Sequence, residues 1–172
     1  MGYKIDRELI ENLLEGKWHV EPPKGWFATH LSESRFSALG KQTLCIAMDE
    51  KTWQKGTGNT GIYSGWANTH ELVHEYPSLY GAIIAQYPIL NIDPTIPQFI
   101  TQDSFHIINQ FSNYIRDKLT SKVIAVTGTV GKTSTKDYLN RLLSMFGSVY
   151  ATNKNHNSRT GVKLTLSNAM HN

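Results

Sequence analysis

Two short stretches of the sequence contain residues that, by their type and order, could bind a ligand or catalyse a reaction. The first, Thr127–Thr135, reads T-G-T-V-G-K-T-S-T and leads from a β-branched run into a predicted helix. In such a loop several backbone N–H groups point into one concavity at the positive end of the helix, where phosphate oxygens are stabilised. Gly128 and Gly131 permit the torsions and the close approach that this needs. We expect Lys132 to reach the β- and γ-phosphates of ATP, and Thr133 to place its hydroxyl on Mg²⁺.

This loop is a shortened form of the general phosphate-loop pattern. The pattern G-x-x-x-x-G-K-[ST] requires glycine at position 126, where this chain has Val126, and its first glycine is Gly128. The order of strand, glycines, Lys-Thr and helix is nevertheless the one that nucleotide binding requires. We assign Lys132 as the catalytic residue and Thr133 as the metal ligand. The predicted nucleotide-binding residues of the loop are Gly128, Thr129, Val130, Gly131, Lys132, Thr133 and Ser134.

The second stretch, His70–His74, reads H-E-L-V-H and matches the zinc-protease signature H-E-x-x-H. On a helix, His70 and His74 would share a face and could bind Zn²⁺, with Glu71 as general base. Pro77 ends any helix here, and the third ligand would have to come from a distant residue. The alternative is a solvated helical turn, so zinc hydrolysis stays a competing hypothesis. The distant ligand candidates are His30, Glu33 and Glu50.

The phosphate loop needs a parallel sheet to support it. Lys122–Thr127 is a continuous β-branched run, typical of a strand buried on both faces. A helix follows from Lys132 to Phe146, and Ser148–Ala151 begins another strand. On its inner side we expect Tyr138, Leu139, Leu142 and Leu143. This unit opens an α/β nucleotide-binding domain, and we place its boundary near Leu119–Ser121.

The preceding residues predict a small mixed α/β domain. Asp6 caps an amphipathic helix that ends near Gly16, and Asp103–Leu119 is the clearest helix of this part. Thr69–Tyr76 allows one or two helical turns, and Lys55–Gly65 is typical of a loop because it is dense in Gly, Asn, Thr and Ser. The segments with strand character are Thr43–Met48, Gly81–Ala85 and Gln98–Thr101.

Bulk properties exclude several classes of protein. The net charge is +3 in 172 residues, and the basic residues are spread out, so the sequence does not indicate nucleic-acid binding. No stretch approaches the roughly 20 apolar residues of a membrane span, and the N-terminus is not a signal peptide. The single cysteine, Cys45, lies in an apolar run, which favours a buried thiol in a reducing compartment. We therefore expect a cytoplasmic protein.

The loop and the segment after it resemble the Mur ligase and folylpolyglutamate synthetase superfamily. Its loop reads T-G-T-x-G-K-T-[ST], and Ala151–Leu166 is similar to the family stretch T-x-G-N-x-N-N-x-x-G-V-P-L-T-L. This chain departs from the family at Val130, Ser158, Arg159 and Lys163. Through the resemblance, Asn155 and Asn157 join the nucleotide-binding residues. The matching positions of the downstream stretch are Asn155, Asn157, Gly161, Val162, Leu164, Thr165 and Leu166.

The first part is similar to the Mur branches that add the third amino acid or the terminal dipeptide to the cell-wall precursor. Leu31–Arg35 resembles their T-D-S-R segment, and the run T-S-T-K-D favours the D-Ala-D-Ala-adding branch. The resemblance implies an ATP- and Mg²⁺-dependent amide ligase that proceeds through an acyl phosphate. Its partners would be ATP, a UDP-sugar-peptide held by Ser34 and Arg35, and an amino acid or dipeptide. It implies no nucleic acid and no membrane.

The resemblance also implies a two-part chain. Residues 1–119 would form the substrate domain, which binds the UDP-sugar. Residues 120–172 would form the opening of a parallel-sheet central ATP-binding domain. Because family enzymes continue for several hundred residues, we expect a truncated chain that does not catalyse ligation alone. A nucleotide-binding fragment without catalysis is therefore the second hypothesis.

Overall fold

A five-stranded sheet organises the first hundred residues of the computed structural model, which describes residues 3–34, 37–58, 68–153 and 158–169. The strand order is β2-β7-β6-β5-β4. The last four are mutually parallel, and β2 pairs antiparallel with β7. The strands of this sheet are β2 (Lys17–Val20), β4 (His30–Ser32), β5 (Thr43–Ile46), β6 (Ala82–Ala85) and β7 (Gln98–Ile100). A mixed α/β fold with a mostly parallel sheet is confirmed, and so are the predicted strands at 43–48, 81–85 and 98–101.

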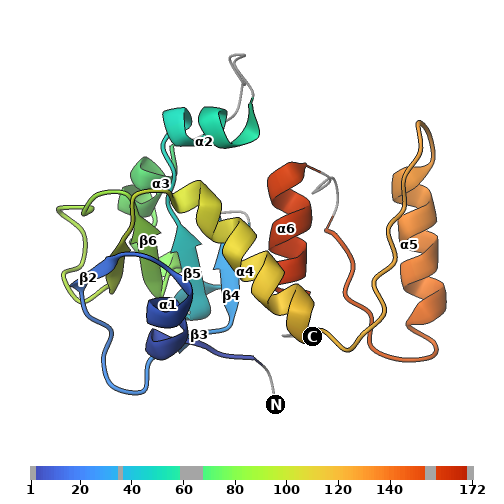
Figure 1. Ribbon diagram of the computed structural model, residues 1–172, viewed down its shortest axis with the longest axis horizontal. Helices are drawn as coiled ribbons and strands as arrows, with labels where there is room; N and C mark the ends of the chain where they lie inside the picture. The colour runs from blue at the N-terminus through green and yellow to red at the C-terminus, as the bar shows by residue number, and fades with distance from the viewer. Residues whose placement is uncertain (1–2, 35–36, 59–67, 154–157, 170–172) are drawn as a thin grey trace.

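The helices bring the loops into place around this sheet (Figure 1). Asp6 caps α1 by accepting from the Leu9 N–H, as predicted. Asp103 caps α4 by accepting from the His106 N–H. A short pair, β1 (Ile5–Asp6) with β3 (Phe27–Ala28), closes the N-terminal side. The helices are α1 (Arg7–Leu13), α2 (Glu50–Thr57), α3 (Thr69–Glu75), α4 (Ser104–Lys118), α5 (Lys132–Leu143) and α6 (Arg159–Ser167), with single 3-10 turns at Gly40–Gln42 and Pro77–Leu79.

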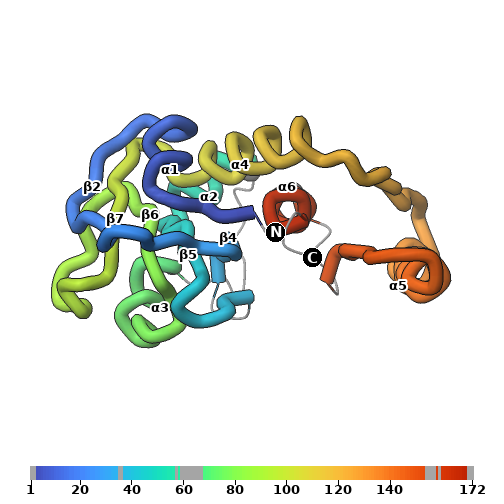
Figure 2. Tube along the Cα trace, turned by 90° about the horizontal axis from the view of Figure 1, so that it is seen from below, coloured from blue at the N-terminus to red at the C-terminus, as the bar shows by residue number. Residues whose placement is uncertain are grey.

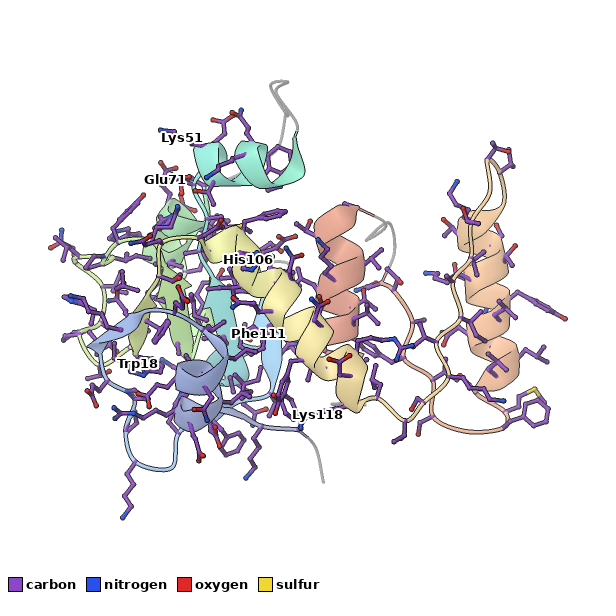
Figure 3. All side chains as sticks on the ribbon, in the orientation of Figure 1. Trp18, Lys51, Glu71, His106, Phe111 and Lys118 are labelled. Carbon is purple, nitrogen blue, oxygen red and sulfur yellow. The ribbon has the colours of Figure 1, made fainter. Side chains whose placement is uncertain are left out.

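Each face of the sheet has its own core, because alternate strand residues point to opposite sides. Leu44 and Ile84 face a cluster that includes Phe111 of α4 and Leu164 of α6. Cys45 and Ile83 face a second cluster. Figure 3 shows Phe111 in the middle of α4, where the helix crosses the sheet. The predicted burial of Cys45 is confirmed, since its side chain is fully buried.

The segment around the phosphate loop differs from the prediction. Lys122–Thr127 and Ser148–Ala151 form no strand, because no strand in the described residues lies beside them to complete a ladder. Val123 and Ile124 are therefore exposed. Helix α5 stands apart from the sheet and from the other helices (Figures 1 and 2). The prediction of a buried face for α5 is wrong as well. The helix has no buried residue, and Tyr138 and Leu142 are exposed.

Two further local predictions need correction. The Gly-rich stretch from Lys55 begins inside α2, which runs to Thr57 and ends at Gly58 with a left-handed φ of 69°. The rest of that predicted loop lies largely outside the described residues. Helix α6 was not predicted. It begins after Ser158, which accepts from the Gly161 N–H, and it packs along α4.

Candidate functional site

The predicted phosphate loop has the backbone that its glycines were expected to provide. Gly128 has φ 147° and Gly131 has φ 80°, a region that residues with a Cβ rarely adopt. Gly131 is the residue before α5, and no heavy atom lies within 4 Å of the position its Cβ would take. The loop is therefore open at the point where an anion would enter, and Val130 at its tip is 90% exposed.

Helix α5 begins at Lys132, so its first turn carries the predicted phosphate and metal groups. Thr135 donates to the Gly131 carbonyl, which is the first i→i−4 bond of the helix. The N–H groups of Lys132, Thr133 and Ser134 precede it and have no partner within the helix by geometry. The Thr133 and Ser134 side chains are exposed there. This end of α5 presents donors and the positive pole of the helix dipole to solvent.

The Lys132 ammonium group lies against the backbone carbonyls of the loop. Its Nζ donates to the Gly128 carbonyl and lies 3.4 Å from the Thr129 carbonyl oxygen. A phosphate that entered the loop would meet this charge together with the free N–H groups of the first turn. Further along the helix, Lys136 donates to the Thr152 carbonyl at 2.7 Å and pairs with Asp137 at 2.9 Å. The structure thus brings together the predicted residues from Gly128 to Ser134.

The second predicted group lies at the carboxyl end of β4, in the turn that contains Ser34. The Ser34 N–H donates to Ser32 Oγ at 3.1 Å, and Ser32 Oγ donates to the Ser34 carbonyl at 2.6 Å. Ser37 joins this network through its hydroxyl, 2.6 Å from Ser32 Oγ. Thr69 at the start of α3 donates to the Glu33 carbonyl. The turn is therefore fixed by side chains from two elements, while Arg35, Asn155 and Asn157 lie outside the described residues.

One carboxyl group beside this turn was considered in the sequence only as a zinc-ligand candidate. Glu33 hydrogen-bonds the Thr160 hydroxyl at the start of α6, and its Oε2 atom is completely buried with no hydrogen-bond partner among the described residues. Burial raises the pKa of Glu33 from 4.5 to about 7, although the Thr160 hydrogen bond acts in the opposite direction. No local pattern points to this contact, because Thr160 is far away in the sequence.

The H-E-L-V-H segment does form a helix, but its two histidines have different surroundings. The His70 ring is buried and stacks on Tyr87, with ring centroids 4.4 Å apart. Burial lowers the pKa of His70, which keeps its ring neutral near pH 7. His74 is exposed, and α3 ends one residue later. Across the described ranges, no three His, Cys, Asp or Glu side chains cluster as metal ligands would, so the zinc hypothesis gains no support.

Two hollows of the surface lie away from both predicted groups. One, of about 660 Å³, lies at the carboxyl end of β7 and includes Thr101, Asp103 and His106. The other, of about 470 Å³, lies beside α1 and includes Arg7 and Trp26. Neither contains a predicted site residue. No helix among the residues that the structure describes is long and apolar enough to span a bilayer.

Comparison with known proteins finds sequence similarity to Mur ligases over part of the chain. The sequence model of the Mur ligase middle domain matches residues 126–172. The UDP-N-acetylmuramoyl-tripeptide–D-alanyl-D-alanine ligase of Synechocystis is 35% identical over 85 residues, 49% of this chain and 19% of the relative. That of Escherichia coli is 35% identical over 86 residues, 50% of this chain and 18% of the relative. This chain therefore matches about a fifth of the length of these relatives.

A solved structure extends the likeness to almost the whole chain. The UDP-N-acetylmuramoylalanyl-D-glutamyl-2,6-diaminopimelate–D-alanyl-D-alanyl ligase from Acinetobacter baumannii superposes with a TM-score of 0.69. The match covers 97% of this chain and 34% of that structure, at 22% sequence identity. At this identity the likeness concerns the fold, and it includes the residues before position 126 that the middle-domain match leaves out.

Proposed function

Because this chain is a member of the Mur ligase family, we propose that it is the nucleotide-binding front part of an ATP-dependent amide ligase. The acceptor would be a UDP-sugar-peptide of cell-wall precursor synthesis, and the amine an amino acid or dipeptide. The γ-phosphoryl group of ATP would pass to the substrate carboxylate and release ADP. The amine would then attack the acyl phosphate, forming the amide and releasing inorganic phosphate.

One observation carries the nucleotide part of this proposal. Gly128 and Gly131 hold left-handed torsions at the start of α5, and Lys132 lies across the mouth of the loop between them. In the bound state Lys132 would leave the loop carbonyls and neutralise charge on the β- and γ-phosphates. Thr133 would offer its hydroxyl to Mg²⁺, which balances the charge of the phosphates during transfer. Thr129, Val130 and Ser134 would contribute backbone N–H groups, and Asn155 and Asn157 complete the proposed set.

The remaining proposed residues belong to the UDP-sugar. Ser34 has its hydroxyl 3.2 Å from that of Ser37, within the turn that ends β4. Such a turn can present hydroxyl and N–H groups to a uridine or a diphosphate, with Arg35 as the charged partner. We further propose that residues 1–119 form the UDP-sugar domain and residues 120–172 the opening of the ATP-binding domain. We propose the cytoplasm as the site of action, because ATP and UDP-sugars are supplied there.

Calorimetric titration with ATP and Mg²⁺ tests the nucleotide site. We expect binding by the wild-type chain, and at least a tenfold loss of affinity in Lys132→Ala because the variant lacks the phosphate charge partner. Lys122→Ala is the matched control, since it removes the same charge from an exposed position before the loop. Equal affinities for Lys132→Ala and wild type would refute the assignment of this loop. Titration with UDP, comparing Ser34→Ala with the exposed control Ser78→Ala, tests the second site.

An assay of phosphate release separates ligation from binding alone. A chain that only binds nucleotide releases no phosphate when the acceptor and the amine are added. A chain that ligates forms one phosphate per amide. We expect this chain alone to bind and not to ligate, because its described residues around the loop supply phosphate contacts but no group for the amine.

A further inference from the structure

A single buried hydroxyl group organises the turn that follows β4. Ser32 is the last residue of this strand, and its side chain is fully buried. Its Oγ atom donates to the Ser34 carbonyl at 2.6 Å and accepts from the Ser34 N–H at 3.1 Å. The hydroxyl oxygen of Ser37 lies 2.6 Å from Ser32 Oγ. Ser32 therefore contacts both backbone groups of Ser34 and the side chain of a third serine.

The number of hydroxyl protons decides the direction of these hydrogen bonds. A hydroxyl group has one proton to donate and two lone pairs that accept. A carbonyl oxygen cannot donate, so the 2.6 Å contact with the Ser34 carbonyl requires the Ser32 proton. The Ser37 hydroxyl then donates to Ser32 Oγ, a much nearer acceptor than the Ser34 carbonyl at 3.5 Å. The Ser34 hydroxyl, 3.2 Å from Ser37 Oγ, donates to Ser37. In this order Ser32 Oγ uses its proton and both lone pairs within the turn.

The strand that carries Ser32 is held on both of its sides. On the inner side β4 pairs in parallel with β5, where Ser32 lies opposite Cys45. On the outer side the Leu31 N–H donates to Asn168 Oδ1 at 2.8 Å, and Asn168 Nδ2 donates to the Leu31 carbonyl at 3.0 Å. Figures 1 and 2 show α6 next to β4 on this outer side. The Ser32 hydroxyl therefore projects from a fixed backbone, as a group that orients a turn must.

The residue between Ser32 and Ser34 is fixed from another direction. The Thr69 hydroxyl, at the start of α3, donates to the Glu33 carbonyl at 3.1 Å. The side chain of Ser34 is only partly buried, whereas that of Ser32 is fully buried. A ligand can therefore reach Ser34, and Ser32 can act on that ligand only through Ser34.

We infer that Ser32 is a positioning residue for the UDP-sugar, because its buried hydroxyl orients Ser34 in the turn after β4. The inference rests on the proposed function of this turn. Ser32 does not touch the ligand. It fixes the backbone of Ser34, and through Ser37 the Ser34 hydroxyl, before the ligand arrives. Groups that are already fixed lose less conformational freedom on binding, so the Ser32 hydroxyl should contribute to the affinity for UDP.

Calorimetric titration with UDP tests the role of the Ser32 hydroxyl. Ser32→Ala should raise the dissociation constant of UDP at least about fivefold, because the turn loses its central donor and acceptor. Ser32→Thr keeps the hydroxyl, so its dissociation constant should stay within about twofold of the wild-type value. Ser104→Ala is the matched control. Ser104 is equally buried, but its hydroxyl has no hydrogen-bond partner in the described part of the chain, so this variant should bind UDP as the wild type does.

The outcomes separate the positioning role from the proposed site. If Ser34→Ala weakens UDP binding and folded Ser32→Ala does not, the positioning role is wrong and the proposed site stands. Equal losses in Ser32→Thr and Ser32→Ala would also overturn the role, because the hydroxyl would then make no difference. A wild type that does not bind UDP would overturn the proposed site and the inference with it.

A second variant covers the case in which Ser32→Ala does not fold, as judged by circular dichroism. Ser32→Cys keeps the shape of the side chain, but a thiol is a weaker donor and acceptor than a hydroxyl. Its dissociation constant for UDP should therefore rise above the wild-type value. An unchanged UDP affinity in folded Ser32→Cys would refute the positioning role.

Amide hydrogen exchange gives a measurement that needs no ligand. The Ser34 amide donates to Ser32 Oγ, so it should exchange at least about tenfold faster in Ser32→Ala than in the wild type. Ser104→Ala should leave this rate unchanged, and the amides of β6 should exchange equally in all three proteins. Equal exchange of the Ser34 amide in Ser32→Ala and the wild type would overturn the positioning role, whether or not the turn binds UDP.

Discussion

The buried carboxyl group of Glu33 should make the stability of this protein fall as the pH rises from mildly acidic to alkaline values. Its pKa in the folded chain is raised to about 7 from 4.5, mainly because burial disfavours the charged form. A raised carboxyl pKa means that folding favours the protonated group. Its contribution is fully present below pH 4.5 and is lost as the pH rises through 7.

The magnitude follows from the two pKa values. A difference of one in pKa corresponds to about 1.4 kcal/mol, so the wild type should lose at most about 3 kcal/mol between acidic and alkaline pH through this group. The Glu33→Gln variant removes the charge and keeps the shape. At pH 5 it should unfold at nearly the same temperature as the wild type, and at pH 8 it should unfold up to about 10 °C higher.

Thermal unfolding followed by circular dichroism at half-unit steps from pH 5 to 8 measures this difference. Only the difference between wild type and variant matters, because every other titratable group is the same in both proteins. Glu75→Gln serves as the control, since Glu75 is exposed at the end of α3 and should leave the pH profile unchanged. Parallel wild-type and Glu33→Gln profiles across this range would refute the reasoning about Glu33.

Three further predictions concern the loop, the core and the histidines. Gly131→Ala should weaken MgATP binding and cost about 1–2 kcal/mol of strain at a positive φ, measured by calorimetry and urea unfolding. Gly147→Ala should change neither, because φ is not positive there and the space around its Cβ position is open. Phe111→Ala should lower the free energy of unfolding by about 3–5 kcal/mol, and Leu142→Ala on the exposed face of α5 by less than about 1 kcal/mol. A similar loss in both would contradict the core assignment. Chelation with EDTA should leave the melting temperature and the metal content unchanged, and stoichiometric zinc that disappears in His70→Ala would restore the zinc hypothesis.

The sequence predicts well the elements that are determined by residues within or next to them. Asp103 before an apolar repeat predicts α4 with its cap, and Asp6 does the same for α1. The buried strands around Leu44 and Ile83 follow from short apolar runs between turn residues. In the predicted phosphate loop, the residue type alone accounts for the positive φ of Gly128 and Gly131, because these torsions do not depend on distant contacts.

The failures arise where a partner elsewhere decides the structure. Lys122–Thr127 has the composition of a buried strand, but a strand exists only when a neighbour accepts its hydrogen bonds, and none in the described residues does. The same absence leaves the apolar residues Tyr138 and Leu142 of α5 exposed. Composition therefore predicts what these segments can form with a partner, and the contacts determine whether they form it.

The sequence did not predict α6 for a different reason, which concerns the residues that the helix buries. Hydrophobic periodicity detects a helix whose buried face is apolar, but among the buried residues of α6 and its C-cap only Leu164 is large and apolar. The other buried residues are Thr160, Gly161, Ser167 and Asn168, and polar residues are seldom fully buried in a core. Their use makes sense where a helix must hydrogen-bond a strand edge, as Asn168 does with Leu31 across 137 residues of sequence. The buried polar face of α6 therefore gives no periodic apolar signal, and the contact that explains Asn168 is visible only in the folded chain.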